Sequence, residues 1–144
     1  MGPRRKARQA VLEALYAFEA GEYRESPEIL QEIWNYCYER YDLGEKAEFF
    51  GEKLFRTVLR NKATIDELIK RNLQNWQMSR VALVDRNILR MGVCEIVFLP
   101  EIPRKVAIDE SIELAKKYST KDSGRFVNGV LDNITESSLE DLHE

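Results

Sequence analysis

The sequence predicts an all-α protein with about seven helices in two small packed helical bundles. Apolar residues recur at helical intervals along most of the chain, and no segment shows the sustained period-2 alternation of a half-buried strand. Serine, glycine and proline stand where these helical patterns begin and end. The chain has 144 residues, and we expect one domain over 1–144, with an N-terminal helical half at about 1–75 and a C-terminal helical half at about 79–142.

Two helices are predicted in the first part of the chain. The first spans about 4–20 and ends near Gly21, because apolar residues repeat there with the period of a helix. The second begins after Ser26, a favourable N-cap residue, and carries Pro27 in its first turn. Its apolar face continues to the break at 42–44.

The middle of the chain carries a long apolar pattern over 50–73. Thr64 is a candidate cap for a new helix inside this pattern, and Ser79 is a candidate cap for the helix that follows. Two prolines mark a short stiff loop at 100–103. The apolar positions of the helix after this loop are Ile108, Ile112 and Ala115.

The stretch YSTKDSGRFVNGVLD, residues 118–132, is unusual for a segment that only packs. Ser119 and Asp122 have the S-x-x-D spacing of a capping box. Two glycines in the following helix each cost roughly 1 kcal/mol relative to alanine. We interpret Gly129 as a point of close helix packing, and Gly124 as a place where an anion or a base approaches the backbone.

An aromatic ring and a basic cluster leave two interpretations open. Phe126 is either a core ring or a ring that stacks on an unpaired base. Near the N-terminus, Arg4 and Arg8 would place like charges side by side at the positive end of a helix, a penalty that a bound phosphate would relieve. The alternative is a solvated, frayed terminus. The cluster contains Arg4, Arg5, Lys6 and Arg8.

The composition argues against catalysis and metal binding. The formal net charge is -3, so no basic field covers the whole protein. Cys37 and Cys94 have no metal-ligand neighbours, and the only histidine is His143. Asp109 and Glu110 are adjacent, so a helix would point them about 100° apart, a poor geometry for an acid/base pair. We expect no catalytic residue, no metal and no cofactor.

No signal peptide or apolar run of membrane-spanning length is visible, so we expect a cytoplasmic protein with no membrane partner.

Three segments make the sequence resemble the NusB family of bacterial transcription antitermination factors. They are RRKARQAVLEALYAFEAGE, DRNILRMGVCEI and IPRKVAIDESIELAKKYSTKDSGRFVNGVLDNI. The resemblance is most specific over 99–134 and weakest over 22–78. Ser111 stands where the family more often has alanine, and Arg125 stands where it commonly has lysine.

The resemblance implies an all-helical, non-enzymatic protein. It implies binding of single-stranded boxA RNA together with a small-subunit ribosomal protein, NusE, and entry into the RNA polymerase antitermination complex that reads through ribosomal RNA operons. Self-association into a homodimer is left open.

The family's site residues carry over by position. The basic N-terminal run corresponds to the cluster named above, and Tyr16 and Asp85 correspond to partner-facing positions that we expect on one exposed surface. We also expect the basic run and the second RNA-facing segment to converge in space. The second RNA-facing segment corresponds to Lys121, Asp122, Ser123, Arg125 and Phe126.

Two other functions stay open. One is a protein–protein adaptor that binds no RNA. The other is a stand-alone relative of the RNA-binding module that is fused to ribosomal-RNA cytosine methyltransferases. This chain ends where such a catalytic domain would begin, so we expect the stand-alone factor.

Overall fold

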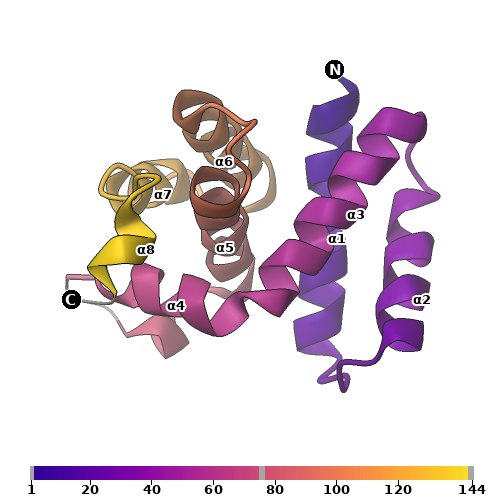
Figure 1. Ribbon diagram of the computed structural model, residues 1–144, viewed down its shortest axis with the longest axis horizontal. Coiled ribbons are helices and arrows are strands. Elements are labelled where there is room, and N and C mark those ends of the chain that lie inside the picture. Colours follow the sequence, from indigo (N-terminus) through magenta and orange to yellow (C-terminus); the bar gives the residue numbers. More distant parts are fainter. Residues whose placement is uncertain (1, 75–76, 143–144) are drawn as a thin grey trace. The chain divides into compact units, whose positions relative to one another are not determined.

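The computed structural model describes residues 2–74 and 77–142, and it divides the chain into two compact units, Met1–Leu59 and Arg60–Glu144. The described residues form eight α-helices and one 3-10 helix and no strand, which confirms the all-α prediction (Figure 1). The helices are α1 (Pro3–Ala20), α2 (Pro27–Tyr38), α3 (Glu45–Arg60), α4 (Lys62–Lys70), η1 (Met78–Arg80), α5 (Leu83–Phe98), α6 (Arg104–Tyr118), α7 (Ser123–Leu131) and α8 (Ser138–Asp141).

The helix boundaries of the first unit follow the local sequence signals. The backbone N–H of Gly21 donates to Ala17 O over 3.0 Å and closes α1, as predicted. The hydroxyl oxygen of Ser26 accepts from the backbone N–H of Ile29 over 3.2 Å, so this serine caps α2. These signals succeed because the partner groups lie within four residues along the chain.

The core of the first unit forms around Trp34 of α2. Its ring is fully buried and stacks on Tyr38, with ring centroids 5.5 Å apart. It also stacks on Phe55 of α3, with centroids 5.9 Å apart. Since α1 and α2 also lie side by side (Figure 1), the three helices enclose one apolar interior.

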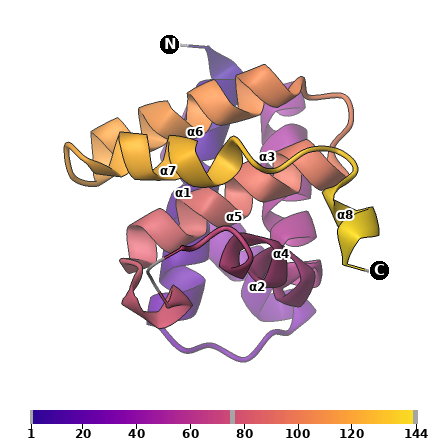
Figure 2. The same ribbon diagram turned by 90° about the vertical axis from the view of Figure 1, so that its left-hand side faces the viewer.

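Helix α5 is the centre of the second unit. Every residue from Asn87 to Ile96 is buried, and α4, α6 and α7 all pack on α5. Figure 2 shows α6 and α7 running side by side next to α5. A Cβ on Gly92 would lie 2.7 Å from Leu131 Cδ1 and 2.8 Å from Ser111 Oγ, so a larger residue would force these side chains of α7 and α6 to shift.

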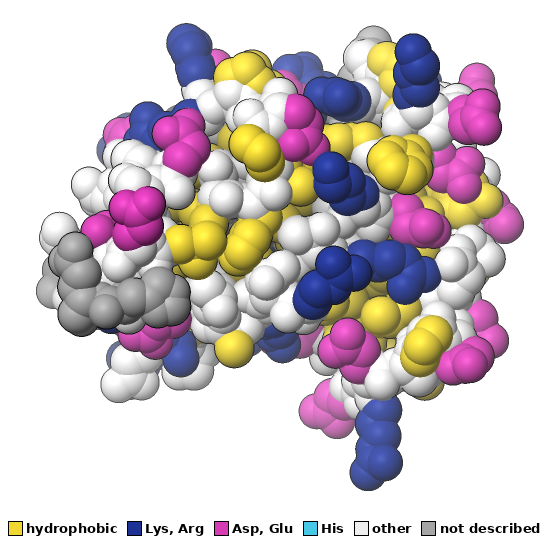
Figure 3. All heavy atoms as spheres, viewed as in Figure 1, with side chains coloured by type: hydrophobic (Ala, Val, Ile, Leu, Met, Phe, Trp, Pro, Cys, Tyr) yellow, Lys and Arg dark blue, Asp and Glu magenta, His cyan; other side chains and the backbone are white. Residues whose placement is uncertain are grey.

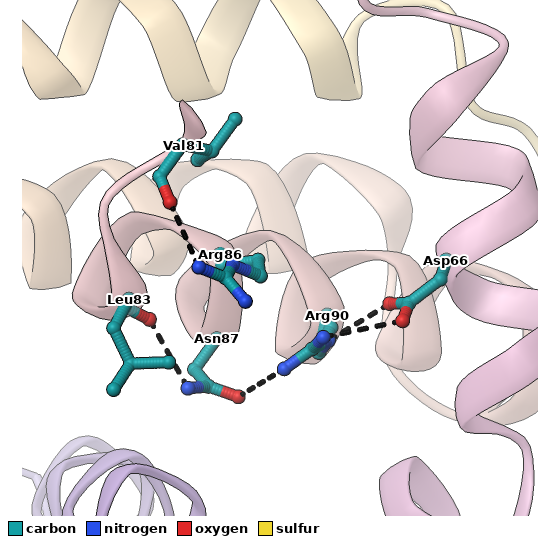
Figure 4. Close-up of polar contacts among 6 residues, drawn as sticks. All are labelled: Asp66, Val81, Leu83, Arg86, Asn87 and Arg90. Carbon is teal, nitrogen blue, oxygen red and sulfur yellow. Dashed lines mark hydrogen bonds and ion pairs between the residues drawn. The ribbon is translucent and has the colours of Figure 1, made fainter. Parts of the chain in front are cut away.

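A buried ion pair joins α4 to α5 (Figure 4). Arg90 Nε donates to Asp66 Oδ1 over 2.8 Å, and Arg90 Nη2 donates to Asp66 Oδ2 over 3.1 Å. Arg90 Nη1 also donates to Asn87 Oδ1 over 3.0 Å, and Asn87 Nδ2 donates to Leu83 O over 3.1 Å. The guanidinium is 4% exposed, so its charge is compensated inside the protein rather than by water.

Two predicted helix starts are wrong. The long apolar pattern breaks at Asn61, and Thr64 lies inside α4 rather than at its cap. Ser79 belongs to η1, and α5 begins only after Ala82. In both cases a favourable cap residue was present, but it does not start a helix because Thr64 already lies inside α4 and Ser79 already lies inside η1.

The boundary between the two units falls at 59/60, whereas the sequence suggested a junction near 75–80. Helix α4 packs on α5 and on η1, and so it belongs to the second unit. Part of the expected junction, residues 75–76, lies outside the described residues, as does His143. None of the described helices is long and apolar enough to cross a membrane.

Candidate RNA interface

The start of α7 is organised by the hydroxyl of Ser123. Its Oγ lies 2.8 Å from Ser119 Oγ and 2.9 Å from Thr120 Oγ1, accepts from Thr120 N over 3.3 Å, and donates to Asp85 Oδ2 over 3.0 Å. The residue is 4% exposed. Ser123, predicted to face RNA, therefore holds the turn between α6 and α7 against the start of α5.

The predicted capping box of Ser119 and Asp122 is wrong. Asp122 itself stands at the N-cap of α7, and its carboxylate makes no capping hydrogen bond. Ser119 is instead the C-cap of α6. The S-x-x-D spacing failed because the chain leaves one helix and enters the next within four residues, so the two positions belong to different helix ends. Asp122 remains exposed and keeps its carboxylate oxygens available.

The charged residues of this segment point to solvent, while its ring does not. Lys121 and Arg125 are exposed, and Phe126 is half-buried. Phe126 is neither a core ring nor a fully exposed one, because it lines a cavity between the start of α5 and the start of α7.

This cavity has a volume of about 480 Å³. Val81 and Ala82 line it from the segment before α5, Asp85 lines it from the first turn of α5, and Thr120 and Ser123 line it beside Phe126. Arg80 and Asp122 add one charge of each sign. Arg80 lies in no motif of the sequence, and Thr120, although it lies in the stretch 118–132, was not singled out there; only the tertiary fold brings the two residues to one cavity.

Asp85 is not an exposed carboxylate, which corrects the expectation for this position. The residue is 9% exposed, and Oδ2 is the acceptor of the Ser123 hydroxyl. Oδ1 is buried and has no hydrogen-bond partner among the described residues. The carboxylate is therefore only half satisfied.

The two glycines of α7 do not have the roles assigned to them. A Cβ on Gly129 would meet nothing within 4 Å, so no helix packs tightly there. A Cβ on Gly124 would meet Ile112 Cγ2 at 3.5 Å and Lys116 Cγ at 3.7 Å, which is ordinary van der Waals contact. Gly124 is buried against α6, so its backbone is not open to an anion or a base from solvent.

The basic N-terminal cluster lies within helix α1. Helix α1 begins at Pro3, and the guanidinium carbons of Arg4 and Arg8 lie 4.8 Å and 5.0 Å from the centroid of the Phe50 ring. This cation–π pair offsets the like-charge repulsion that the sequence predicted.

The members of the cluster differ in exposure. Arg4 and Arg5 are exposed and Lys6 is half-buried, but Arg8 is 3% exposed. Arg8 is therefore poorly placed for the phosphate contact expected of it. Sequence analysis did not single out Phe49, a large apolar side chain that precedes Phe50 and is 73% exposed.

Tyr16, the other predicted partner-facing residue, is 43% exposed on α1. Tyr16 belongs to the first unit and Asp85 to the second, so their common surface stays a prediction, as does the convergence of the basic cluster with the start of α7. On the face shown in Figure 3, cations, acids and apolar side chains are interspersed, in keeping with the net charge of -3.

The comparisons with known proteins cover nearly the whole chain. The model of the NusB family matches residues 5–136. Transcription antitermination protein NusB of Sorangium cellulosum (strain So ce56) is 40% identical over 138 residues, which is 95% of this chain and 94% of that protein.

Solved structures are also similar to this chain over nearly its whole length. A structure of T. maritima NusB has a TM-score of 0.80 at 39% identity and covers 98% of this chain and 99% of that chain. A structure of antitermination factors NusB and NusE in complex with dsRNA has a TM-score of 0.78 at 30% identity, with coverages of 94% and 97%.

The fold and the candidate site define a class of small helical proteins whose site side chains are of the types that contact a bound ligand. The described residues contain no group of three or more His, Cys, Asp or Glu that could hold a metal ion. Exposed cations and a half-buried ring beside a cavity are instead groups that contact phosphates and flat apolar ligands. Because the family model matches residues 5–136, the chain belongs to the NusB family.

Proposed function

We propose that this protein is a transcription antitermination factor that binds single-stranded boxA-type RNA together with the ribosomal protein NusE. The resulting complex joins RNA polymerase and promotes read-through of ribosomal RNA operons. The observation that carries this proposal is the start of α7, where exposed Lys121, Asp122 and Arg125 stand within five chain positions of the half-buried Phe126, and Asp122 and Phe126 line the same cavity. The family match supports the biological setting.

The chemistry of this segment suits an unpaired RNA strand. Phosphate contacts by lysine and arginine position a strand, and aromatic stacking together with hydrogen bonds to base edges reads it. The Phe126 ring can stack only on a base that has left its helix, and the exposed Asp122 carboxylate can accept from a base amino group. The similar solved structure of NusB and NusE is a complex with dsRNA. The test therefore compares the affinity for a single strand with the affinity for a duplex.

Few cations are available, which favours a second protein in the complex. Arg4, Arg5, Lys121 and Arg125 are exposed and Lys6 is half-buried, whereas Arg8 is buried. If all five contact phosphates, the slope of log K against log salt is no steeper than about -3.5 for a single strand. A partner protein that extends the RNA-binding surface would add to the modest affinity that these phosphate contacts supply. We propose that Tyr16 contacts this partner.

The test is a titration of fluorescent single-stranded boxA RNA with this protein, with and without NusE, over a series of salt concentrations. We expect weak binding alone, tighter binding with NusE, and weaker binding of a duplex of the same sequence. Arg5→Ala should weaken binding to all single strands similarly and should flatten the salt slope. Absence of RNA binding both with and without NusE would instead support the protein–protein adaptor.

A further inference from the structure

We propose that α3 carries a further contact for single-stranded RNA, in which an unstacked base stacks on the exposed ring of Phe49 and the flanking phosphates contact Lys46 and Lys53. We call these three residues the α3 stripe. The inference rests on the proposed function and extends the RNA surface to a helix that contains neither the basic N-terminal cluster nor the start of α7.

The ring of Phe49 lies outside the core of the first unit. It is 73% exposed, whereas the next residue, Phe50, is 6% exposed, because successive residues of a helix point about 100° apart. A single exposed ring is common on protein surfaces, so the neighbours of Phe49 decide what it can bind. The buried residues of α3 are Ala47, Phe50, Gly51, Leu54, Phe55, Val58 and Leu59.

Two lysines flank the ring along the helix. Lys46 precedes Phe49 by three residues and Lys53 follows it by four, so all three side chains share one face of α3. Both lysines are exposed. A flat ring between positive charges is the combination with which proteins bind unpaired nucleic acid strands. Lysine is depleted in protein–protein interfaces, so the composition of the α3 stripe favours RNA over a protein partner.

The acidic residues of α3 occupy another face of the helix. Glu45, Glu48 and Glu52 recur at intervals of three and four residues, so they form a stripe of their own. This acidic stripe turns toward α2 at Glu52, whose Oε1 accepts from Gln31 Nε2 over 3.4 Å. Arg56 Nε also lies 3.9 Å from Glu52 Oε2 and compensates its charge. No acid of α3 therefore lies between the two lysines of the α3 stripe.

The α3 stripe is continuous with the basic N-terminal cluster. The guanidinium carbons of Arg4 and Arg8 lie 4.8 Å and 5.0 Å from the centroid of the Phe50 ring, so the first turns of α1 lie against the turn of α3 that also carries Phe49. Arg4 is exposed. An RNA strand whose phosphate contacts Arg4 therefore lies close to the α3 stripe, and one strand can use both.

The first experiment measures the affinity of variants for a fluorescent single-stranded boxA RNA, alone and with NusE. Phe49→Ala should weaken binding about 5-fold or more, because stacking of a base on the ring is lost. Phe49→Tyr keeps a ring and should stay within about 2-fold of the wild type, whereas Phe49→Leu keeps only apolar surface and should behave like Phe49→Ala. Lys46→Ala and Lys53→Ala should each flatten the slope of log K against log salt by up to about 0.7.

Tyr36→Ala is the matched control. Tyr36 is 72% exposed on α2, nearly the same as Phe49, but the guanidinium carbon of Arg40 lies 5.6 Å from the centroid of its ring. The same guanidinium pairs with Glu13, so this second exposed ring has no uncompensated cation beside it on the Arg40 side. We expect RNA affinity within about 2-fold of the wild type for Tyr36→Ala, and wild-type melting temperatures for Tyr36→Ala and Phe49→Ala.

A second experiment locates the contact without relying on affinity. RNAs that carry 5-iodouridine at one position at a time are irradiated in the complex, since this base forms a crosslink with an aromatic ring on which it stacks. After digestion with trypsin, we expect a crosslink in the peptide 47–53 at one RNA position. Phe49→Ala should abolish this crosslink, because the remaining ring of that peptide, Phe50, is buried.

The outcomes separate the α3 stripe from the proposed function. If RNA binds but Phe49→Ala matches Tyr36→Ala and no crosslink forms in 47–53, the α3 stripe is not an RNA contact and the proposed function stands. If Phe49→Ala weakens binding of NusE and leaves RNA affinity unchanged, the stripe is a protein contact and the RNA assignment is wrong. Absence of RNA binding both with and without NusE overturns the proposed function and the α3 stripe together.

Discussion

The hydroxyl of Ser123 donates to Asp85 Oδ2 over 3.0 Å, and this bond fastens the first residue of α7 to the first turn of α5. The two residues are 38 positions apart in the chain. The same hydroxyl also meets Ser119 and Thr120, so a single oxygen organises the turn that presents the candidate RNA-binding residues.

Ser123→Ala should therefore destabilise the protein by about 1–3 kcal/mol, because it leaves a buried carboxylate without its donor. Urea unfolding followed by circular dichroism measures this change. Ser137→Ala is the matched control, since Ser137 is exposed and bonds only locally, to Thr135 Oγ1 at 3.0 Å; we expect a change within about 0.5 kcal/mol there. Equal effects of the two variants would show that the Ser123 network contributes nothing special.

Two ion pairs of similar length should differ in their contribution to stability. Asp66→Ala leaves the 4%-exposed Arg90 buried without its carboxylate, and we expect a loss of about 3–5 kcal/mol. Asp109→Ala removes the partner of Lys105 at 2.9 Å, but these side chains are 55% and 86% exposed, so the loss should stay below about 0.5 kcal/mol. Thermal unfolding of both variants measures the two losses of stability. A small effect of Asp66→Ala would contradict the conclusion that burial makes the Asp66–Arg90 pair important for stability.

Phe126→Ala should weaken binding of single-stranded RNA by about 1–3 kcal/mol, because stacking on the ring is lost. Its melting temperature should fall only slightly, since the ring is half-buried at the edge of a cavity. Val127→Ala, at the fully buried next position, should show the opposite pattern: reduced stability and unchanged affinity of the folded protein. A sharp drop in melting temperature with intact RNA affinity in Phe126→Ala would make this ring structural.

Tyr16→Ala should weaken binding to the ribosomal protein with little change in melting temperature. Tyr16 is 43% exposed and presents a ring with a polar end, a residue type that interfaces favour. Tyr36→Ala is the control, because Tyr36 is even more exposed, at 72%, and lies on α2. Calorimetric titration with NusE should separate them, and similar affinities for the two variants would remove Tyr16 from the partner site.

The two cysteines should be unreactive in the folded protein. Burial raises the pKa of Cys94 far above its usual range, and burial followed by the nearby Glu13 carboxylate raises the pKa of Cys37, against an opposing effect of Arg40. A raised pKa means that the reactive thiolate forms only at higher pH, so alkylation by iodoacetamide near pH 8 should be slow and should not reach the rate of a free thiol. In urea both thiols should react at the ordinary rate. Rapid modification of either cysteine in the native protein would contradict this assignment.

Local sequence signals succeeded where the responding group is close in the chain. Ser26 caps α2 because its oxygen needs only the N–H three residues ahead, and Gly21 ends α1 through a carbonyl four residues back. The cap assignments for Thr64 and Ser79 failed because capping needs an extended residue at the helix entrance, and the backbone at both positions is already in a helical turn.

The sequence by itself determined the all-α class and most of the helices, because the apolar period is a property of the chain alone. It also determined the family resemblance and the position of Lys121 and Arg125 shortly before Phe126 in the chain. Only the tertiary structure decided what each polar group can do. Arg8 became buried beside Phe50, and Ser123 became the centre of a hydrogen-bond network. Asp85 became a half-satisfied carboxylate in a cavity, because packing of α7 on α5 removed it from water and supplied one donor for its two oxygens.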